Sequence, residues 1–197
     1  MLIFYGLGNN EAKYLNTKHN IGRVVVEQLA ARLQANFVDS GQGCMLAKAK
    51  VGQTDIWLVY SKAFMNTSGE PISKLIKYFK LDCQNYQLTI LQDDSDQLVG
   101  SNKIMPGGGS AGHYGITSSY LHLANLVHQK DIWRLKIGIR PEGNKLRSET
   151  FVLSSCNLVE AENATKLSQI ILDNLSYFET RNIGKLQNII HTREIKS

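Results

Sequence analysis

A histidine and an aspartate in this chain have the types and positions that acid–base chemistry needs. His19 directly precedes a long helical pattern. An unperturbed imidazole, with a pKa of about 6.5, is the side chain best suited to be a general base at neutral pH. Such a base needs a carboxylate that orients it, and Asp93, at the end of an apolar run, is the candidate. We therefore predict that the two side chains meet in one open groove; the alternative is that His19 is a capping or surface residue.

Three other chemistries fit the sequence less well. The GLG motif at 6–8 opens like a dinucleotide fingerprint, but Glu11 at the third glycine position would bring a carboxylate to the pyrophosphate. Ser61 and Ser68 lie outside a GxSxG elbow, which disfavours a serine nucleophile. The five histidines form no HExxH or HxH pair. We therefore expect no metal and no other cofactor, and only a metal site assembled from distant segments stays open.

Two loops could shape the surroundings of the base. Phe64, Met65 and Asn66 stand at a predicted helix start, where Asn66 either caps the helix or faces a ligand beside an apolar wall. The segment 107–112 contains four glycines. A hairpin connection explains two of these glycines. A segment with four glycines therefore predicts a mobile gate or a close approach of the backbone to a ligand.

Positive charge is concentrated in one part of the chain. Lys and Arg number 22 and Asp and Glu 17, which gives a net charge of +5. The segment 130–147 holds six basic and two acidic residues, a net +4. Arg134 and Lys136 share one face of a predicted strand, because side chains alternate along a strand. The segment is either a solvated strand edge or a patch that contacts phosphates.

Strands and helices alternate around these groups. Strands are predicted at 2–7, 47–51, 55–60, 86–91, 98–105 and 132–139, and helices at 20–34, 116–126 and 182–191, with two more that begin at the capping boxes Thr67–Glu70 and Asn157–Glu160. This order predicts an α/β fold with a mixed, mostly parallel sheet flanked by helices. Ligand sites in such sheets lie beyond the carboxyl ends of the strands.

Length and composition predict one globular domain over residues 1–197, with a basic helical tail over about 180–197. The chain is 43% apolar and 20% charged, which is ordinary for a globular protein. Its three cysteines form no CxxC pair, and no secretory signal or apolar run of about 20 residues is present. We therefore expect a cytoplasmic protein with reduced thiols and no contact with a membrane.

Five segments together resemble the bacterial-type peptidyl-tRNA hydrolase family, in a divergent form. They are GLGNNEAKYLNTKHNIG at 6–22, SKAFMNTSG at 61–69, QDDSD at 92–96, PGGGSAGHYG at 106–115 and RLKIGI at 134–139. The resemblance covers almost the whole chain. It implies a monomeric single-domain enzyme that cleaves the ester between a peptide and the 3′-terminal ribose of tRNA, so peptidyl-tRNA is the expected partner.

Residue roles follow from the same resemblance. It implies that His19 is the catalytic base, that Asp93 orients it and that Asn9 helps to hold substrate and water. The residues implied in substrate binding are Tyr14, Phe64, Met65, Asn66, His113 and Tyr114, and those implied in contacts with tRNA phosphates are Lys103, Arg134 and Lys136. Arg181, Lys185 and Arg193 in the tail are further candidates for phosphate contacts.

The chain departs from the family pattern at several positions. Asn10 and Glu11 replace Pro-Gly, Tyr114 replaces an asparagine, and Met105 stands where a lysine is common. We therefore expect the base machinery to be present and the affinity for tRNA and peptide to be altered. Two alternatives follow: a non-catalytic RNA-binding relative of the same fold, and a hydrolase of another small ester or amide.

Overall fold

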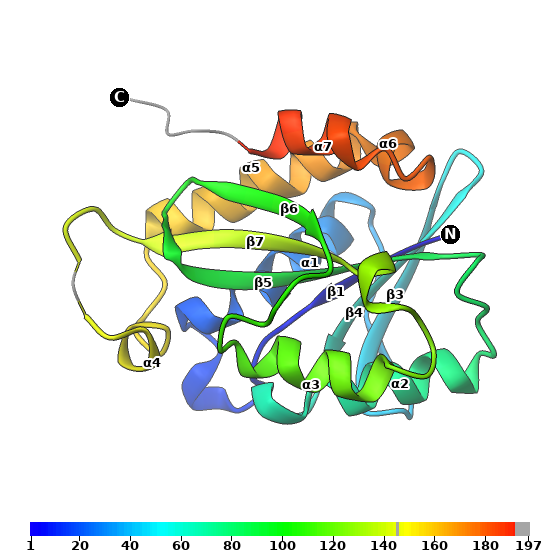
Figure 1. Cartoon of the computed structure of the whole chain (residues 1–197), viewed down its shortest axis with the longest axis horizontal. Coiled ribbons are helices and arrows are strands. Elements are labelled where there is room, and N and C mark those ends of the chain that lie inside the picture. Colours follow the sequence, from blue (N-terminus) through cyan, green and yellow to red (C-terminus); the bar gives the residue numbers. More distant parts are fainter. Residues whose placement is uncertain (145, 192–197) are drawn as a thin grey trace.

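A mixed seven-stranded sheet forms the middle layer of the molecule, with the strand order β2-β3-β4-β1-β5-β7-β6 (Figure 1). The computed structural model describes residues 1–144 and 146–191. The strands are β1 (Leu2–Gly6), β2 (Val38–Asp39), β3 (Cys44–Val51), β4 (Thr54–Ser61), β5 (Gln87–Leu98), β6 (Asn102–Pro106) and β7 (Trp133–Arg140). The central strands β4, β1, β5 and β7 are parallel, and the outer strands pair antiparallel. The predicted α/β class with a mixed sheet is confirmed.

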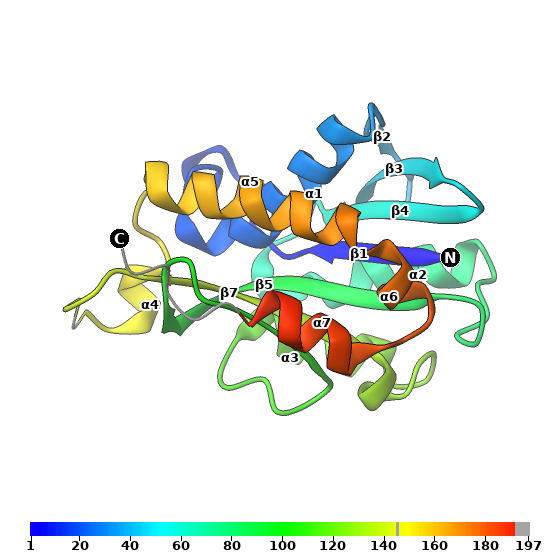
Figure 2. The same cartoon turned by 90° about the horizontal axis from the view of Figure 1, so that it is seen from above.

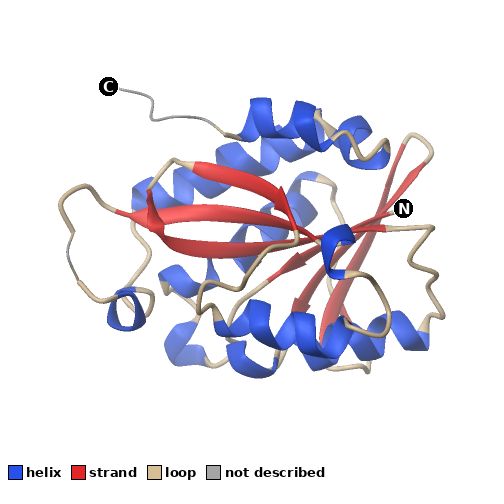
Figure 3. Ribbon diagram, viewed as in Figure 1, coloured by secondary structure: helices blue, strands red, loops and turns tan. Residues whose placement is uncertain are grey.

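Helices cover both faces of this sheet (Figures 2 and 3). One face carries α1 (Ile21–Arg32), α5 (Leu158–Asp173), α6 (Leu175–Glu179) and α7 (Ile183–Ile190), and the other carries α2 (Gly69–Tyr78) and α3 (Tyr114–Leu123). The short helix α4 (Ser148–Phe151) lies beyond the carboxyl end of β7. Within the described residues, every helix is too short or too polar to cross a membrane.

Strand β1 explains why the sequence opens on a continuous apolar run. Leu2 and Phe4 belong to the core beneath α1 and α5, whereas Ile3 and Tyr5 belong to the core beneath α2 and α3. A parallel strand covered on both faces buries every side chain, so its apolar residues do not alternate with polar ones.

Some element boundaries differ from the prediction. Strand β5 continues through the acidic cluster to Leu98, so Asp93 lies within a strand and not in a loop after it. The predicted Thr67–Glu70 capping box is wrong, because α2 begins at Gly69 and the Thr67 hydroxyl donates to the Phe64 carbonyl. The Asn157–Glu160 capping box is confirmed at the start of α5. The helix predicted to follow it is divided at Asn174 into α5 and α6.

A glycine lets α1 lie directly against the sheet. A Cβ atom on Gly22 would stand 2.2 Å from the Leu91 carbonyl oxygen of β5, so this contact requires glycine. The Arg23 amide donates to the Leu7 carbonyl at 3.1 Å, just after β1. The segment before α1 therefore lies where β1 and β5 end.

Candidate active site

His19 and Asp93 meet at the carboxyl end of the sheet, although 74 residues separate them in sequence. His19 lies in a short 3₁₀ helix, η2 (Lys18–Asn20), immediately before α1, and Asp93 lies in β5. The imidazole Nδ1 is 2.7 Å from Asp93 Oδ1. Because a carboxylate only accepts, the proton lies on Nδ1, and Nε2 is left as an acceptor. His19 therefore has the form that a general base needs.

A second imidazole bonds to the same carboxylate oxygen. His113 Nε2 lies 3.0 Å from Asp93 Oδ1, while the Gly115 amide donates to His113 Nδ1 at 3.1 Å. The amide requires His113 Nδ1 to be an acceptor, so the proton of this ring is on Nε2 and is given to Asp93. In this form His113 has both nitrogens occupied, whereas Nε2 of His19 has no hydrogen-bond partner among the described residues. The geometry thus distinguishes the base from its neighbour.

The Asp93 carboxylate is held in its charged form. Only 3% of the residue is exposed. Burial by itself raises its pKa, but the neighbouring imidazoles of His19 and His113 and the hydrogen bonds that they donate outweigh burial, so the pKa of Asp93 lies well below its usual range. Asp93 is therefore ionised at neutral pH and can stabilise a positive charge that develops on His19.

We expect Asp93 to make the stability of the fold depend on acid. Its pKa is lower in the folded than in the unfolded state, so the carboxylate stabilises the fold above the ordinary aspartate value of about 3.9. This contribution is lost as the pH falls through the folded-state pKa. Urea unfolding of the wild type and Asp93→Asn, from about pH 7 to about pH 2, should show a difference in unfolding free energy that shrinks with acid. A difference that is constant over this range would contradict the account.

Asn9 ties the loop after β1 to the loop before α2. Its Oδ1 accepts a hydrogen bond from the Met65 amide at 2.7 Å. Its main-chain amide and carbonyl bond to the Asn20 side chain at 2.6 and 2.9 Å. The Nδ2 donors of Asn9 have no partner among the described residues, and Asn9 lines the cleft that contains His19. The amide therefore offers two donors to a ligand.

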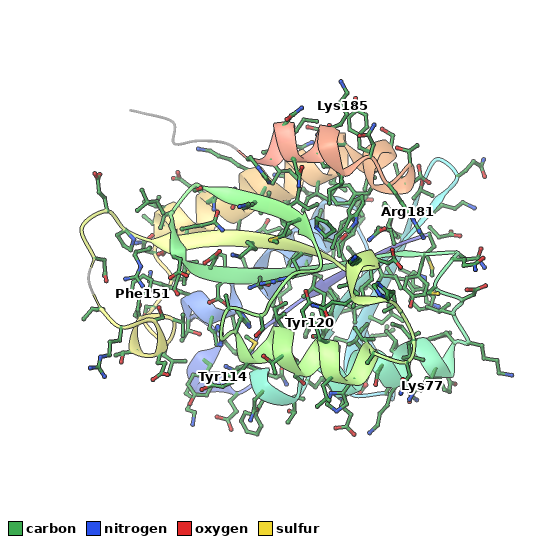
Figure 4. All side chains as sticks on the ribbon, in the orientation of Figure 1. Lys77, Tyr114, Tyr120, Phe151, Arg181 and Lys185 are labelled. Atoms are coloured by element: carbon green, nitrogen blue, oxygen red, sulfur yellow. The ribbon has the colours of Figure 1, made fainter. Side chains whose placement is uncertain are left out.

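The cleft above His19 has a volume of about 350 Å³. The structure places the predicted residues Asn9, Tyr14, Phe64, Met65, Asn66 and Tyr114 along it. An adjoining cavity of about 120 Å³ is lined by Asp93 and His113, and both spaces share His19 and Tyr114. Tyr114, at the start of α3, is 61% exposed and lies at the same end of the molecule as α4 (Figure 4).

The sequence profile of the peptidyl-tRNA hydrolase family matches residues 3–197 of this chain. The chain belongs to that family. The peptidyl-tRNA hydrolase of Dinoroseobacter shibae is 30% identical over 98% of this chain and 79% of its own length. The mitochondrial peptidyl-tRNA hydrolase of rice is 34% identical over 81% of this chain and 62% of its own length.

A solved structure from the peptidyl-tRNA hydrolase family has the same fold. The crystal structure of the Acinetobacter baumannii peptidyl-tRNA hydrolase aligns with a TM-score of 0.81 at 25% identity, covering 98% of this chain and 95% of that chain. The predicted family and the predicted fold class are both confirmed.

Arg134 is buried, so the prediction that it contacts a tRNA phosphate is wrong. Only 1% of it is exposed, because the glycine-rich segment 107–112 lies over its side chain on one face of the sheet. Its Nε donates to Gln92 Oε1 at 2.8 Å and its Nη1 to the Gly109 carbonyl at 2.5 Å. Arg134 therefore holds the glycine-rich segment 107–112 against the sheet. The interpretation of the basic segment 130–147 as a solvated strand edge is wrong for its strand, because β7 pairs with both β5 and β6 and is an interior strand.

The remaining predicted phosphate contacts differ in their surroundings. Lys103 on β6 is exposed and lies opposite Lys136 on β7, whereas Lys136 Nζ is 2.5 Å from Asp94 Oδ2. Arg181 Nη2 donates to the Tyr86 carbonyl at 3.0 Å. Arg181 and Lys185 lie on the side of the molecule away from Tyr114 (Figure 4). Arg193 lies outside the described residues, as does Lys145 of the basic segment 130–147.

Three side-chain atoms of the candidate site are close enough to share a cation. His19, Asp93 and His113 each offer one ligand atom, and these atoms lie within 4.8 Å of one another. However, the two ring nitrogens that face Asp93 carry protons, which a metal would have to displace. The expectation of a metal-free site stays a prediction.

The residues of one wall of the cleft were not predicted from the sequence. Glu149, Val152 and Leu153, in and after α4, line it together with the predicted residues. The His19 amide donates to the Val152 carbonyl at 2.9 Å. The helix α4 has four residues and lacks an apolar periodicity that could have predicted it.

Proposed function

We propose that this protein hydrolyses the ester bond between the peptide and the 3′-terminal ribose of peptidyl-tRNA, which returns the tRNA for reuse. The observation that carries the proposal is the His19–Asp93 pair beside an open cleft, in a chain that matches the peptidyl-tRNA hydrolase family over residues 3–197.

The proposed reaction begins with a water molecule between His19 and the ester. Nε2 of His19 takes a proton from the water, whose oxygen attacks the carbonyl carbon of the ester. The Nδ2 donors of Asn9 stabilise the oxyanion that forms on the carbonyl oxygen. When the tetrahedral intermediate collapses, the C–O bond to the ribose breaks, and the imidazolium returns its proton to the departing 3′-oxygen. Asp93 stabilises the imidazolium throughout.

The substrate-binding roles follow from where the side chains lie in the cleft. Phe64, Met65 and Tyr114 supply an apolar wall for the peptide, and Tyr14 closes the same cleft near the loop after β1. Asn66 is exposed and offers its amide to the peptide backbone or the terminal ribose. His113 donates to the same Asp93 oxygen as His19 and so helps to fix the orientation of the carboxylate.

Lys103 is expected to contact a tRNA phosphate. It is exposed, and it pairs with no acidic group among residues 1–144 and 146–191. Lys103→Ala should weaken tRNA binding and reduce the slope of log affinity against log salt by about one. Lys136→Ala should reduce the slope less, since Lys136 must first leave Asp94. Filter binding of tRNA over a salt series measures both slopes.

Lys77→Ala is the matched control for these two variants. Lys77 lies on α2, on the face of the sheet opposite α5–α7 and away from the α4 end of the molecule (Figure 4). We expect it to keep the wild-type salt slope. Equal salt slopes in Lys103→Ala, Lys136→Ala and the wild type would show that the surface with Lys103 and Lys136 does not contact the tRNA.

We further propose that the protein is a monomer and that it is located in the cytoplasm. Cys44, Cys83 and Cys156 are free thiols, as expected in a reducing compartment. A rice relative is named mitochondrial, so family membership by itself does not decide the compartment. Sedimentation of the purified protein tests the monomer, and localisation of the tagged full-length chain tests the compartment.

One assay tests the activity itself. The protein is incubated with an N-acylated aminoacyl-tRNA, and the release of the acyl-amino acid is followed. Repeated turnover is the expected result. Binding of the tRNA without release would instead support a non-catalytic RNA-binding relative, and neither binding nor release would support a hydrolase of another small ester or amide.

A further inference from the structure

A buried ion pair lies directly beside the proposed base. Lys18, the residue before His19, extends its ammonium group to the Glu160 carboxylate of α5. The exposed fractions of the two side chains are 5% and 0%. Such a pair is a poor source of stability, because removing two charges from water costs about as much as their attraction returns. Its presence in the interior therefore calls for another reason.

Glu160 connects Lys18 to the beginning of a long helix. One of its oxygens accepts from Lys18, and the other accepts from the Asn157 amide at 2.5 Å, within the capping box of α5. The Lys18 ammonium also lies 5.4 Å from the centre of the Phe151 ring of α4. Figure 4 shows Phe151 on α4, at the end of the molecule where the cleft lies. One side chain therefore contacts both α4 and α5.

The main chain on either side of Lys18 pairs with the segment between α4 and α5. The Lys18 amide donates to the Ser154 carbonyl at 3.0 Å, and the His19 amide donates to the Val152 carbonyl at 2.9 Å. The Cys156 amide donates to the Asn16 carbonyl at 2.7 Å. The segment that carries the base and the wall of the cleft that contains Val152 are thus one hydrogen-bonded unit.

We propose that Lys18 and Glu160 are a positioning pair, which fixes the orientation of η2 so that Nδ1 of His19 faces Asp93. This inference rests on the proposed role of His19. Thr17, the residue at the N-cap position of η2, makes no side-chain capping hydrogen bond to this helix. Its far end is held by the bonds between Asn20 and Asn9, and its near end by main-chain bonds to the segment after α4 and, among side chains, by the ion pair. Loss of the near anchor lets the imidazole rotate away from Asp93, and misplacement by about 1 Å is enough to cost about a hundredfold in rate.

The test compares Lys18→Met, Lys18→Arg and the double variant Lys18→Met/Glu160→Met. Lys18→Met leaves a buried carboxylate without its partner, so it should lower both the unfolding temperature and kcat, with little change in KM. Lys18→Arg should restore kcat, because a guanidinium also bonds to Glu160. The double variant replaces the pair with apolar groups of similar volume and should recover the unfolding temperature. Its kcat should nevertheless stay about tenfold to a hundredfold below the wild type, because the directional contact is gone.

A proton NMR signal gives a readout that does not depend on substrate. In the wild type, the Nδ1 proton of His19, bonded to Asp93, should give a resolved downfield resonance. It should shift or disappear in the double variant and return in Lys18→Arg. If the wild type shows no turnover, the proposed function fails, but this resonance still decides whether the pair positions His19.

Asn157→Ala is the control for damage to α5. It removes the side chain that caps the helix but keeps the Lys18–Glu160 contact. We expect a lower unfolding temperature with wild-type kcat and an unchanged His19 resonance. The proposal is overturned if the double variant regains wild-type kcat and the wild-type resonance together with its stability, since the pair would then be structural only.

Discussion

Replacing His19 with alanine should lower kcat for peptidyl-tRNA by roughly 10²–10⁴-fold, the usual contribution of a positioned general base. KM should change little, because the cleft and the basic residues proposed to bind substrate stay in place. Initial rates at saturating N-acylated aminoacyl-tRNA measure the effect. Far-UV circular dichroism and the unfolding temperature confirm that the fold is retained.

His122→Ala is the control for loss of a histidine. This imidazole lies on α3 and bonds to the Ser118 carbonyl at 2.9 Å, apart from the Asp93 cluster. Its removal should leave kcat at the wild-type value. Wild-type kcat in His19→Ala would remove His19 from the mechanism, whatever the control shows.

Asp93→Asn should lower kcat on the order of 10²–10⁴-fold. The substitution keeps the shape of the side chain but removes the negative charge that stabilises His19 when it holds a proton. It also puts an amide where both His19 and His113 now donate to one oxygen. The amide oxygen can still accept both hydrogen bonds, but a neutral group stabilises an imidazolium less than a carboxylate does. The measurement is kcat at neutral pH, where Asp93 is ionised.

Asp96→Asn is the matched control on the same strand. Asp96 is exposed, and neither His19 nor His113 bonds to it. It should retain kcat within a factor of about two, because surface charges are strongly screened. Equal losses in Asp93→Asn and Asp96→Asn would indicate a general effect of charge near the cleft and would contradict a specific role for Asp93.

The sequence was sufficient to predict that His19 and Asp93 meet. Apolar runs marked β1 and the first half of β5, and adjacent parallel strands bring their carboxyl ends to one edge of the sheet. The helical periodicity after His19 placed that residue at a helix start beside this edge. Local patterns thus determined the position of the base, and the cleft residues followed from the resemblance to the family.

Other features depend on contacts between distant segments, which local patterns do not report. Arg134 is buried because the segment 107–112 lies over its side chain, and alternation along β7 cannot reveal which segment covers a face of the sheet. The tautomer of His113 depends on the Gly115 amide and on Asp93 together. The partner of Lys18 is 142 residues away. Pairing, burial and protonation state of these residues are therefore properties of the folded chain.

The most direct test of the account is the pH dependence of the single-turnover rate, measured side by side in the wild type and His19→Ala from about pH 5 to about pH 8. With enzyme in excess over N-acylated aminoacyl-tRNA, the rate constant reports the hydrolysis step. The account predicts that the wild-type rate rises along a one-proton limb to a plateau and that this limb is absent in His19→Ala. The same limb in both proteins would show that another group takes the proton from water.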